Sequence, residues 1–231
     1  MKLGVRDAAS LLGVSEKTVY RWISQRKLPT YRVNEQYRFN RAELLEWATA
    51  RRHPVSPQIL VEDADAPVPS LVEALQAGGV FYRVGGTDQE SVLRSVVQVM
   101  PLDQEVDREF LLQVLLARES LGSTGIGEGL AIPHVRNPIV MHISRPMVSL
   151  CFLEHAIDFN AIDGKPVHTL FAIVSPTVTA HLSMLSKLSF GLREGPFAET
   201  VRRQGSREEL FHAAARLEEA TASPSGPPAG A

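Results

Sequence analysis

His134 stands at the end of a glycine-rich stretch and is the side chain best placed for chemistry. The stretch reads Ala117-Arg-Glu-Ser-Leu-Gly-Ser-Thr-Gly-Ile-Gly-Glu-Gly-Leu-Ala-Ile-Pro-His134, and its glycines permit unusual backbone angles and close approach to a ligand. Pro133 restrains the backbone directly before the histidine. Because a neutral imidazole nitrogen is nucleophilic, the pattern suits transfer of a group onto His134.

Other glycine-containing signatures do not fit this stretch. The order G-x-G-x-G follows an expected helix and enters an expected strand, which is the reverse of a dinucleotide-binding turn. The chain has no Gly-Lys-Ser/Thr phosphate loop at this point, and Gly122-Ser-Thr-Gly125 lacks the spacing of a hydrolase nucleophile elbow. The sequence therefore favours a site centred on the histidine.

The remaining histidines and the single cysteine do not form a metal-binding pattern. The spacing of the histidines is unlike that of a zinc site, and one cysteine supplies no thiolate cluster and no internal disulfide. These histidines, which we interpret as structural, are His142, His155, His168 and His212. Cys151 lies between Leu150 and Phe152, which is typical of a buried strand. We expect neither a metal nor a cofactor.

The histidine belongs to a block that alternates between helical and strand-like patterns, residues 70–220. Apolar spacing predicts helices at 70–77, 88–100, 106–119, 179–193 and 207–219, and strands at 80–84, 130–132, 147–153 and 167–174. Two of the helices follow apparent capping boxes, Thr87 with Glu90 and Ser206 with Glu209. Helices interleaved with short strands predict an α/β domain with a covered sheet.

The histidine motif resembles the active-site signature of enzyme IIA proteins of the bacterial phosphoenolpyruvate-dependent phosphotransferase system. The resemblance is to the fructose/mannitol type and its nitrogen-regulatory branch, and it covers about residues 70–218. It is carried by Ser123–His134, Phe159–Val167, Leu170–Val174 and Thr179–Leu182. The resemblance implies an EIIA type-2 domain with a mixed sheet covered by helices. It also implies that His134 accepts a phosphoryl group from a histidine-containing phosphocarrier protein.

The same resemblance implies two further site residues, each of which has a structural alternative. His181 corresponds to the second histidine of the family's site, although a histidine near a helix start needs no function. Arg118 corresponds to the arginine before the glycine loop, but a cation at a helix C-terminus is also favoured by the helix dipole. Without its signature, His134 itself would be read as an ordinary surface or packed histidine. Val135 stands where many relatives have glycine, which predicts narrower access to His134.

The first 53 residues carry a charge opposite to that of the rest of the chain. Eleven Lys/Arg and five Asp/Glu give this segment +6, whereas the remainder, with 13 basic and 21 acidic residues, carries −8. The net charge of −2 for all 231 residues conceals this division. A basic segment next to an acidic one favours a nucleic-acid-binding module at the basic end, although a solvated surface would look similar.

Two short helices and a hairpin are predicted within the basic segment. Apolar residues at 5, 8, 9 and 12 lie on one helix face, Gly13 ends that helix, and Ser15 is a suitable N-cap for a second helix over 16–25. A hairpin follows over 28–39, and Asn40 with Glu43 forms a capping box for a third helix. The motif Ala8–Ile23 resembles the excisionase/MerR-type winged helix-turn-helix family over residues 1–52. That family implies a second helix in the major groove and a wing on the backbone or minor groove.

The outward face of the second helix and the wing hold the candidate DNA-binding side chains. Cationic and hydroxyl groups suit phosphates and base edges. The candidates are Lys17, Thr18, Tyr20, Arg21, Arg32 and Arg38. The alternative is that this small domain docks onto the second one or dimerises without touching DNA. Because one such domain buries little surface on DNA, we also expect a homodimer or a second DNA-bound protein.

Two segments lack the pattern of a packed core. Prolines and acids over 54–69 predict a linker, and residues 221–231 predict a disordered tail. The composition, 44% hydrophobic and 22% charged, excludes collagen-like, fully disordered and disulfide-rich classes. No apolar run approaches the roughly 18 residues of a membrane span, and the start lacks a secretory signal. We therefore expect a cytoplasmic protein that does not contact a membrane.

The sequence predicts a phosphorylation-responsive DNA-binding regulator of the nitrogen-regulatory type, a phosphotransfer protein and not a stand-alone enzyme. One alternative is a phosphocarrier that passes phosphate to a separate IIB component of a sugar permease. The other is a signalling module that acts only through binding a IIB or other regulatory protein. Phosphorylation adds roughly −1.5 to −2 charges, which is enough to create or abolish a contact.

Overall fold

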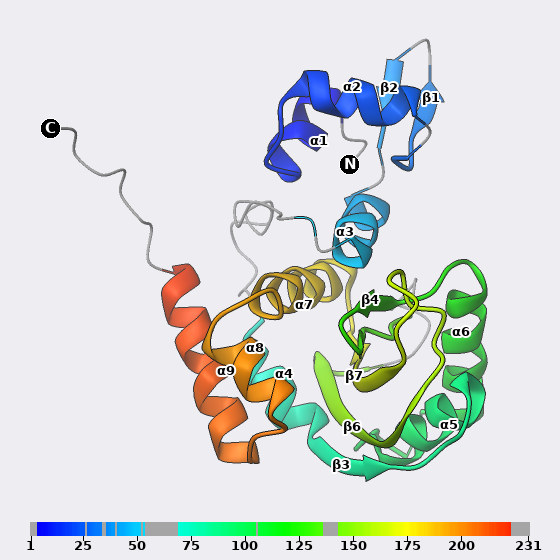
Figure 1. The fold of residues 1–231 in the computed structure, drawn as a ribbon, viewed down its shortest axis with the longest axis vertical. Helices are drawn as coiled ribbons and strands as arrows, with labels where there is room; N and C mark the ends of the chain where they lie inside the picture. Colours follow the sequence, from blue (N-terminus) through cyan, green and yellow to red (C-terminus); the bar gives the residue numbers. More distant parts are fainter. Residues whose placement is uncertain are drawn as a thin grey trace, which may run out of the picture.

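The computed structural model describes residues 4–25, 27–33, 36–39, 41–51, 53, 69–104, 106–135 and 143–222. An N-terminal unit of helices and a hairpin lies beside a larger unit built on a mixed sheet (Figure 1). The expected α/β class and the expected order of the two units are confirmed. In this part of the chain, no helix is both long and apolar enough to cross a membrane.

The N-terminal unit forms the predicted winged helix-turn-helix. Its elements are α1 (Val5–Leu11), α2 (Glu16–Ser24), β1 (Tyr31–Val33), β2 (Gln36–Arg38) and α3 (Arg41–Ala50). Gly13 takes a φ of 62° in the turn between α1 and α2, where the left-handed region favours glycine. Ser15 caps α2, since its side chain accepts a hydrogen bond from the Thr18 N–H. Residue 40, at which a capping box was predicted, lies outside the described residues.

Five strands form the mixed sheet of the larger unit. They are β3 (Val80–Val84), β4 (Gly125–Gly127), β5 (Leu130–Ala131), β6 (Met147–Ile157) and β7 (Val167–Val174). The spatial order is β3-β6-β7-β5-β4, with β3–β6 and β5–β7 parallel and β6–β7 and β4–β5 antiparallel. This arrangement confirms the expectation of a mixed sheet.

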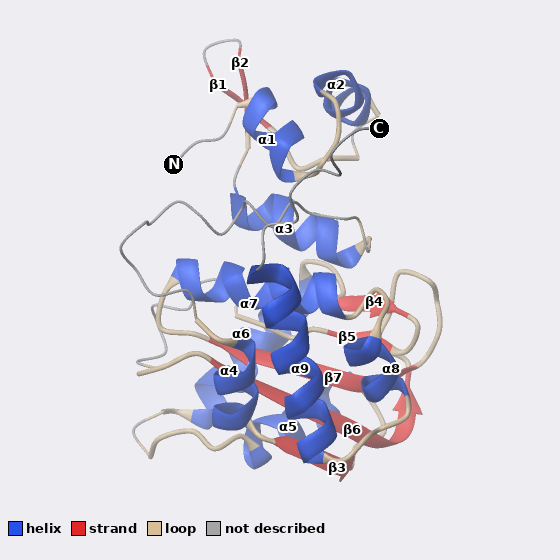
Figure 2. Ribbon diagram, turned by 90° about the vertical axis from the view of Figure 1, so that its left-hand side faces the viewer, coloured by secondary structure: helices blue, strands red, loops and turns tan. Residues whose placement is uncertain are grey.

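Helices cover both faces of this sheet (Figure 2). One layer holds α5 (Gln89–Val99) and α6 (Arg108–Ser120); the other holds α4 (Leu71–Gly78), α7 (Val178–Gly191), α8 (Pro196–Arg202) and α9 (Arg207–Ala222). Along β7, Leu170, Ala172 and Val174 pack toward the α5–α6 layer, whereas Phe171 and Ile173 pack toward the other. Alternate residues of a strand point to opposite faces, so one short apolar run serves both cores.

Three local predictions differ from the structure. The N-cap of α5 is Asp88, which accepts from the Ser91 N–H, so the capping box predicted at Thr87 and Glu90 was wrong by one residue. β4 was not predicted, because glycine has little strand preference of its own. α8 was also missed, although Pro196 at its first position after Gly195 is a typical helix start. By contrast, the predicted capping box of Ser206 and Glu209 is confirmed.

A half-buried polar cluster joins the beginning of the larger unit to its last helix. The Glu218 carboxylate on α9 accepts hydrogen bonds from the Leu71 N–H (2.7 Å) and the Ser70 hydroxyl (2.7 Å), which lie at the N-terminus of α4. Lys187 on α7 pairs with Glu218 and also donates to the Pro69 carbonyl (2.7 Å). The cluster therefore ties three helices to the residue at which the larger unit begins.

Replacing Glu218 with glutamine should destabilise the larger unit by about 1–3 kcal/mol, because the carboxylate that these donors share is lost. Burial alone would raise the pKa of Glu218, but Lys187, Leu71 and Ser70 together lower it. A lowered carboxyl pKa stabilises the fold above the ordinary carboxyl range, and this contribution disappears as the pH falls through the folded pKa. The free energy of unfolding, measured with urea at several pH values, should therefore differ between the wild type and Glu218→Gln. This difference should be largest near neutral pH and should shrink in acid.

The matched control for this prediction is Glu219→Gln, at the exposed neighbouring position. Equal stability losses in the two variants, or a Glu218→Gln effect that grows in acid, would contradict the role given to the cluster.

Candidate functional site

His134 extends the pairing of β5 with β7 by one bridge. It forms an isolated parallel bridge with Ile173, and the Ile173 N–H donates to the Pro133 carbonyl (2.9 Å). The side chain of His134 is only 3% exposed. The histidine is therefore held at the end of a sheet, between the two helical layers.

A backbone carbonyl determines which ring nitrogen of His134 carries the proton. Nδ1 lies 2.7 Å from the carbonyl oxygen of Ile132. Because a carbonyl only accepts hydrogen bonds, Nδ1 carries the proton and the lone pair of the neutral ring is on Nε2. The nitrogen with nucleophilic character is thus Nε2, and it faces the side chain of Arg118.

Arg118 connects the histidine to the glycine turn. It lies in the last turn of α6, and its Nε donates to His134 Nε2 (3.3 Å) while Nη1 donates to the Gly122 carbonyl (2.9 Å). The sequence allowed two interpretations of Arg118, a cation at a helix C-terminus and a residue of the histidine site. Its position agrees with both, because it lies at the end of α6 and also contacts His134. A guanidinium at this place can bond the oxygens of a phosphoryl group on Nε2.

His181 lies beside His134, as the resemblance predicted. The two ring centroids are 5.1 Å apart at an interplanar angle of 47°, and His181 is 2% exposed. His181 is in the first turn of α7, which Thr177 caps by accepting from the Ala180 N–H (3.1 Å). The N-terminal end of a helix favours negative charge, so this turn suits a phosphoryl group nearby.

Glu119 is a part of the site that the sequence did not reveal. Its buried carboxylate accepts from the Thr124 N–H (3.0 Å) and hydroxyl and from the Gln89 side-chain amide (3.1 Å). Burial raises the pKa of Glu119, against the hydrogen bonds from Thr124 and the charge of Arg118, which act to lower it. These contacts close the turn over residues 120–124 and so set the direction in which Arg118 leaves α6.

The glycines of the motif allow the β4–β5 hairpin to pack closely on the segment that follows β6. A Cβ at Gly129, where φ is +75°, would lie 2.3 Å from the ring of His168. A Cβ at Gly125 would lie 2.8 Å from the Cα of Ala161. Asp163 accepts from the Glu128 N–H (2.8 Å) and closes the hairpin from the same segment. The glycines thus position the strand that leads to His134.

The DNA-binding candidates on α2 divide into two groups. Lys17, Tyr20 and Arg21 are exposed, and the Tyr20 ring meets Tyr37 of the hairpin edge-on at 6.1 Å. The Thr18 hydroxyl is instead within 3.1 Å of the Ser15 hydroxyl at the helix cap. Arg32 and Arg38 have their backbones in the hairpin, but their side chains lie outside what the structure describes. Of the candidates on α2, Lys17 and Arg21 are thus the cations whose side chains are exposed.

Comparison with known families divides the chain in the same way. Residues 73–215 match the family described as phosphoenolpyruvate-dependent sugar phosphotransferase system, EIIA 2, and residues 3–52 match a helix-turn-helix domain. The chain belongs to the EIIA 2 family. The family resemblance inferred from the histidine motif is thus confirmed, and so is the fusion to a helix-turn-helix.

Individual relatives of the EIIA 2 domain span regulatory and sugar-related proteins. The chain is 31% identical over 144 residues to the nitrogen regulatory protein of Pseudomonas aeruginosa. This match covers 61% of this chain and 92% of that protein. It is 36% identical over 106 residues to the PTS system fructose-specific EIIA component of Haloferax volcanii. This match covers 45% of this chain and 67% of that protein. The crystal structure of nitrogen regulatory protein IIA-Ntr from Neisseria meningitidis is 26% identical with a TM-score of 0.54, over 62% of this chain and 98% of that chain.

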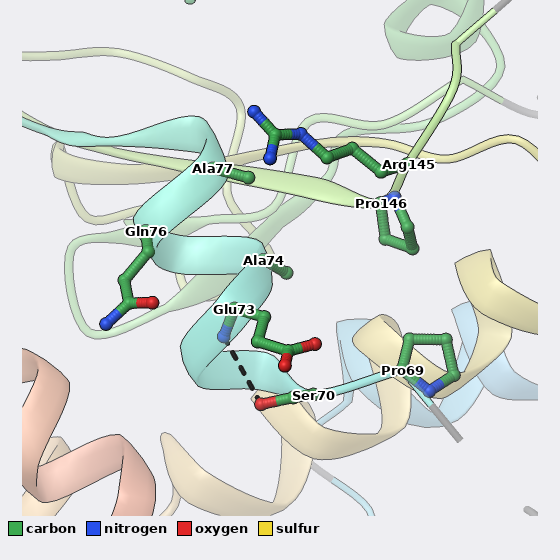
Figure 3. Close-up of a pocket in the computed structure, with 8 residues that line it drawn as sticks. All are labelled: Pro69, Ser70, Glu73, Ala74, Gln76, Ala77, Arg145 and Pro146. Carbon is green, nitrogen blue, oxygen red and sulfur yellow. Dashed lines mark hydrogen bonds between the residues drawn. The ribbon is translucent and has the colours of Figure 1, made fainter. Parts of the chain in front are cut away.

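The EIIA 2 domain also has a pocket of about 420 Å³ between α4 and the residues before β6 (Figure 3). Its lining consists of Pro69, Ser70, Glu73, Ala74, Gln76, Ala77, Arg145 and Pro146. Within this lining, the Glu73 N–H donates to the Ser70 hydroxyl (3.2 Å). The lining includes neither histidine of the pair, so we do not assign the pocket to the histidine site.

Cys151 lies in the core, as the sequence predicted. Cys151 is fully buried, and burial raises the pKa of its thiol to about 12, so it is not a nucleophile in the folded protein. The parts of the EIIA 2 domain that the structure describes contain no group of three or more potential metal ligands. His142 lies outside the described residues.

Nitrogen-15 NMR on the histidine side chains should find the proton of neutral His134 on Nδ1. In Arg118→Leu, the Nε2 signal should move because its donor is lost, while the Nδ1 proton remains on the Ile132 carbonyl. Arg94→Leu, which removes an exposed arginine paired with Glu90 and Glu109, is the control and should leave both signals in place. A proton found on Nε2 of neutral His134 in the wild type would contradict this assignment of the tautomer.

Proposed function

We propose that Nε2 of His134 accepts a phosphoryl group from a histidine-containing phosphocarrier protein, and that the chain is a phosphorylation-responsive DNA-binding regulator of the nitrogen-regulatory type. The observation that carries the first half is the ring held through Nδ1 by Ile132, with Nε2 facing the Arg118 guanidinium. Membership of the EIIA 2 family and similarity to nitrogen regulatory proteins support it.

The transfer itself asks mainly for positioning. The lone pair on Nε2 forms the new bond to phosphorus while the phosphorus–nitrogen bond of the donor breaks and its electron pair returns to the donor imidazole. Arg118 compensates charge on the phosphoryl oxygens, and the Ile132 carbonyl stabilises the positive charge that develops on the ring. His181, at the start of α7, stands where a ring N–H would reach the same oxygens. No step in this scheme needs a metal.

The DNA-binding half is supported by charge and by the helix-turn-helix. The segment 1–53 carries +6, and Lys17 and Arg21 are exposed on the second helix of the motif. The Tyr20–Tyr37 contact fixes the hairpin against α2, so helix and wing present one surface. Such a surface matches phosphate contacts in the major groove and alongside it. A homodimer would supply two such surfaces.

A second candidate is a phosphocarrier that feeds a separate IIB component. The similarity to a fructose-specific EIIA component favours this alternative. The N-terminal helix-turn-helix favours the regulator, since transfer to a IIB protein requires no DNA-binding unit. Transfer of label from the phosphorylated chain to a purified IIB protein, in the absence of any effect of phosphorylation on DNA binding, would decide for the phosphocarrier.

Incubation with phosphoenolpyruvate, enzyme I and phosphocarrier should label the wild type but not His134→Ala, because the acceptor nitrogen is missing. Arg118→Leu should lower the labelling rate by about 10²-fold, since a charge-assisted contact to the phosphoryl group is lost. The measurement is phosphoprotein formation over time on acid-free gels. His212→Gln, at an exposed histidine on α9, is the matched control, and label in His134→Ala equal to that of the wild type would refute the site.

Lys17→Ala and Arg21→Ala should each weaken DNA binding and reduce the slope of log affinity against log salt by about one. The measurement is a fluorescence anisotropy titration of duplex DNA at four or more salt concentrations. Lys165→Ala removes an exposed lysine of the EIIA 2 domain and should change neither quantity. Wild-type affinity without any salt dependence, or no affinity at all, would remove DNA binding from the proposed function.

A further inference from the structure

Helix α3 of the N-terminal unit packs on α7, the helix that carries His181. Leu182, the residue directly after that histidine, is 8% exposed and belongs to the apolar cluster of the N-terminal unit together with Leu44 and Leu45. Both views of the fold show α3 lying over α7 (Figures 1 and 2). The EIIA 2 domain therefore contributes a side chain to the core of the DNA-binding unit.

A buried hydrogen bond joins the two helices near their other ends. The Ser189 hydroxyl on α7 and the Thr49 hydroxyl on α3 are 2.7 Å apart, and both side chains are buried. Leu182 and Ser189 are seven residues apart, so they lie on one stripe of α7 about two turns from each other. The contact thus runs along α7 from the histidine to the last turn of the helix.

The same helix α3 also contacts β4, the strand of the glycine hairpin. This hairpin leads through β5 into His134, whereas α7 carries His181 in its first turn. The N-terminal unit therefore lies against both elements that flank the histidine pair. This position is on the side of the EIIA 2 domain where the reactive nitrogen is held.

The arrangement leaves little room for a donor protein. His134 is 3% exposed and His181 2%, but a phosphoryl donor must bring its phosphorus to about 3–3.5 Å from the accepting nitrogen. The product carries roughly −1.5 to −2 charges, which must be accommodated next to Leu182 in the apolar contact with α3. Docking of α3 and phosphorylation of His134 therefore compete for the same space.

We propose that the α3–α7 contact is a gate on the histidine: the N-terminal unit docks on unphosphorylated α7, and phosphorylation of His134 releases it. This inference rests on the proposed function, because it names how the phosphoryl group reaches the DNA-binding unit. By linkage, the same free energy that makes docking oppose phosphorylation makes phosphorylation oppose docking. Lys17 and Arg21 on α2 remain exposed in the docked form, so release changes how the DNA-binding helix is held without uncovering it.

The test is a reversible lock between the two helices in the full chain. Thr49→Cys combined with Ser189→Cys replaces the two hydroxyls that meet at 2.7 Å, and Cys151 can stay because it is fully buried. Mild oxidation should form the disulfide, and the rate at which His134 is labelled should then fall by at least about tenfold and recover on reduction. Phosphorylation before oxidation should in turn slow formation of the disulfide.

Two further variants make the outcome decisive. Thr49→Cys with Gln98→Cys places the second thiol on an exposed position of α5 and should not change labelling on oxidation. Thr49→Asp puts a charge into the buried contact and should speed labelling, because it favours the released form.

The result that overturns the gate is a fully formed disulfide with unchanged labelling, or no disulfide although both thiols react with a maleimide. A wild-type chain that takes no phosphate at all is a different result. It would contradict the proposed function and remove the gate with it.

Discussion

The hydrogen bond from His134 Nδ1 to the Ile132 carbonyl is the interaction on which the site depends. It connects a ring to the backbone two residues earlier, so it holds only if the chain leaves β5 in one conformation. The pairing of β5 with β7, continued by the bridge to Ile173, supplies that conformation. The glycines of the hairpin allow β5 to reach this position, and Arg118 donates a hydrogen bond to the other ring nitrogen, Nε2.

Much of this site was accessible from the sequence because its parts are close along the chain. Arg118 and His134 are 16 residues apart and belong to one motif, and the end of a helix followed by a glycine turn places them side by side. His181 followed only from the family resemblance, since nothing in its own surroundings in the sequence pairs it with His134. The capping box at Ser206 was predicted because all its partners lie within three residues.

The features that escaped prediction depend on contacts between distant segments. Glu119 is charged and near a helix end, which is typical of an exposed residue, and its burial results from Thr124 and from Gln89 on a different helix. β4 exists as a strand because its partner β5 is held by β7, since its glycines have no preference for that state. Docking of the N-terminal unit on the larger one was an alternative that the sequence left open, but its residues could not be named. Thr49 and Ser189 are 140 positions apart, and neither sequence motif contains a sign of the other.

The bond from Lys187 to the Pro69 carbonyl has a mechanical consequence for the N-terminal unit. It anchors the first residue of the larger unit to α7, the same helix on which α3 docks. Pro69 lies sixteen positions after His53, so the tether can extend at most about 55 Å from this anchor. A short tether of this kind keeps its two ends at an effective concentration in roughly the millimolar range. Docking of the N-terminal unit on α7 is then an intramolecular step. The equilibrium between its docked and released forms therefore does not depend on the protein concentration.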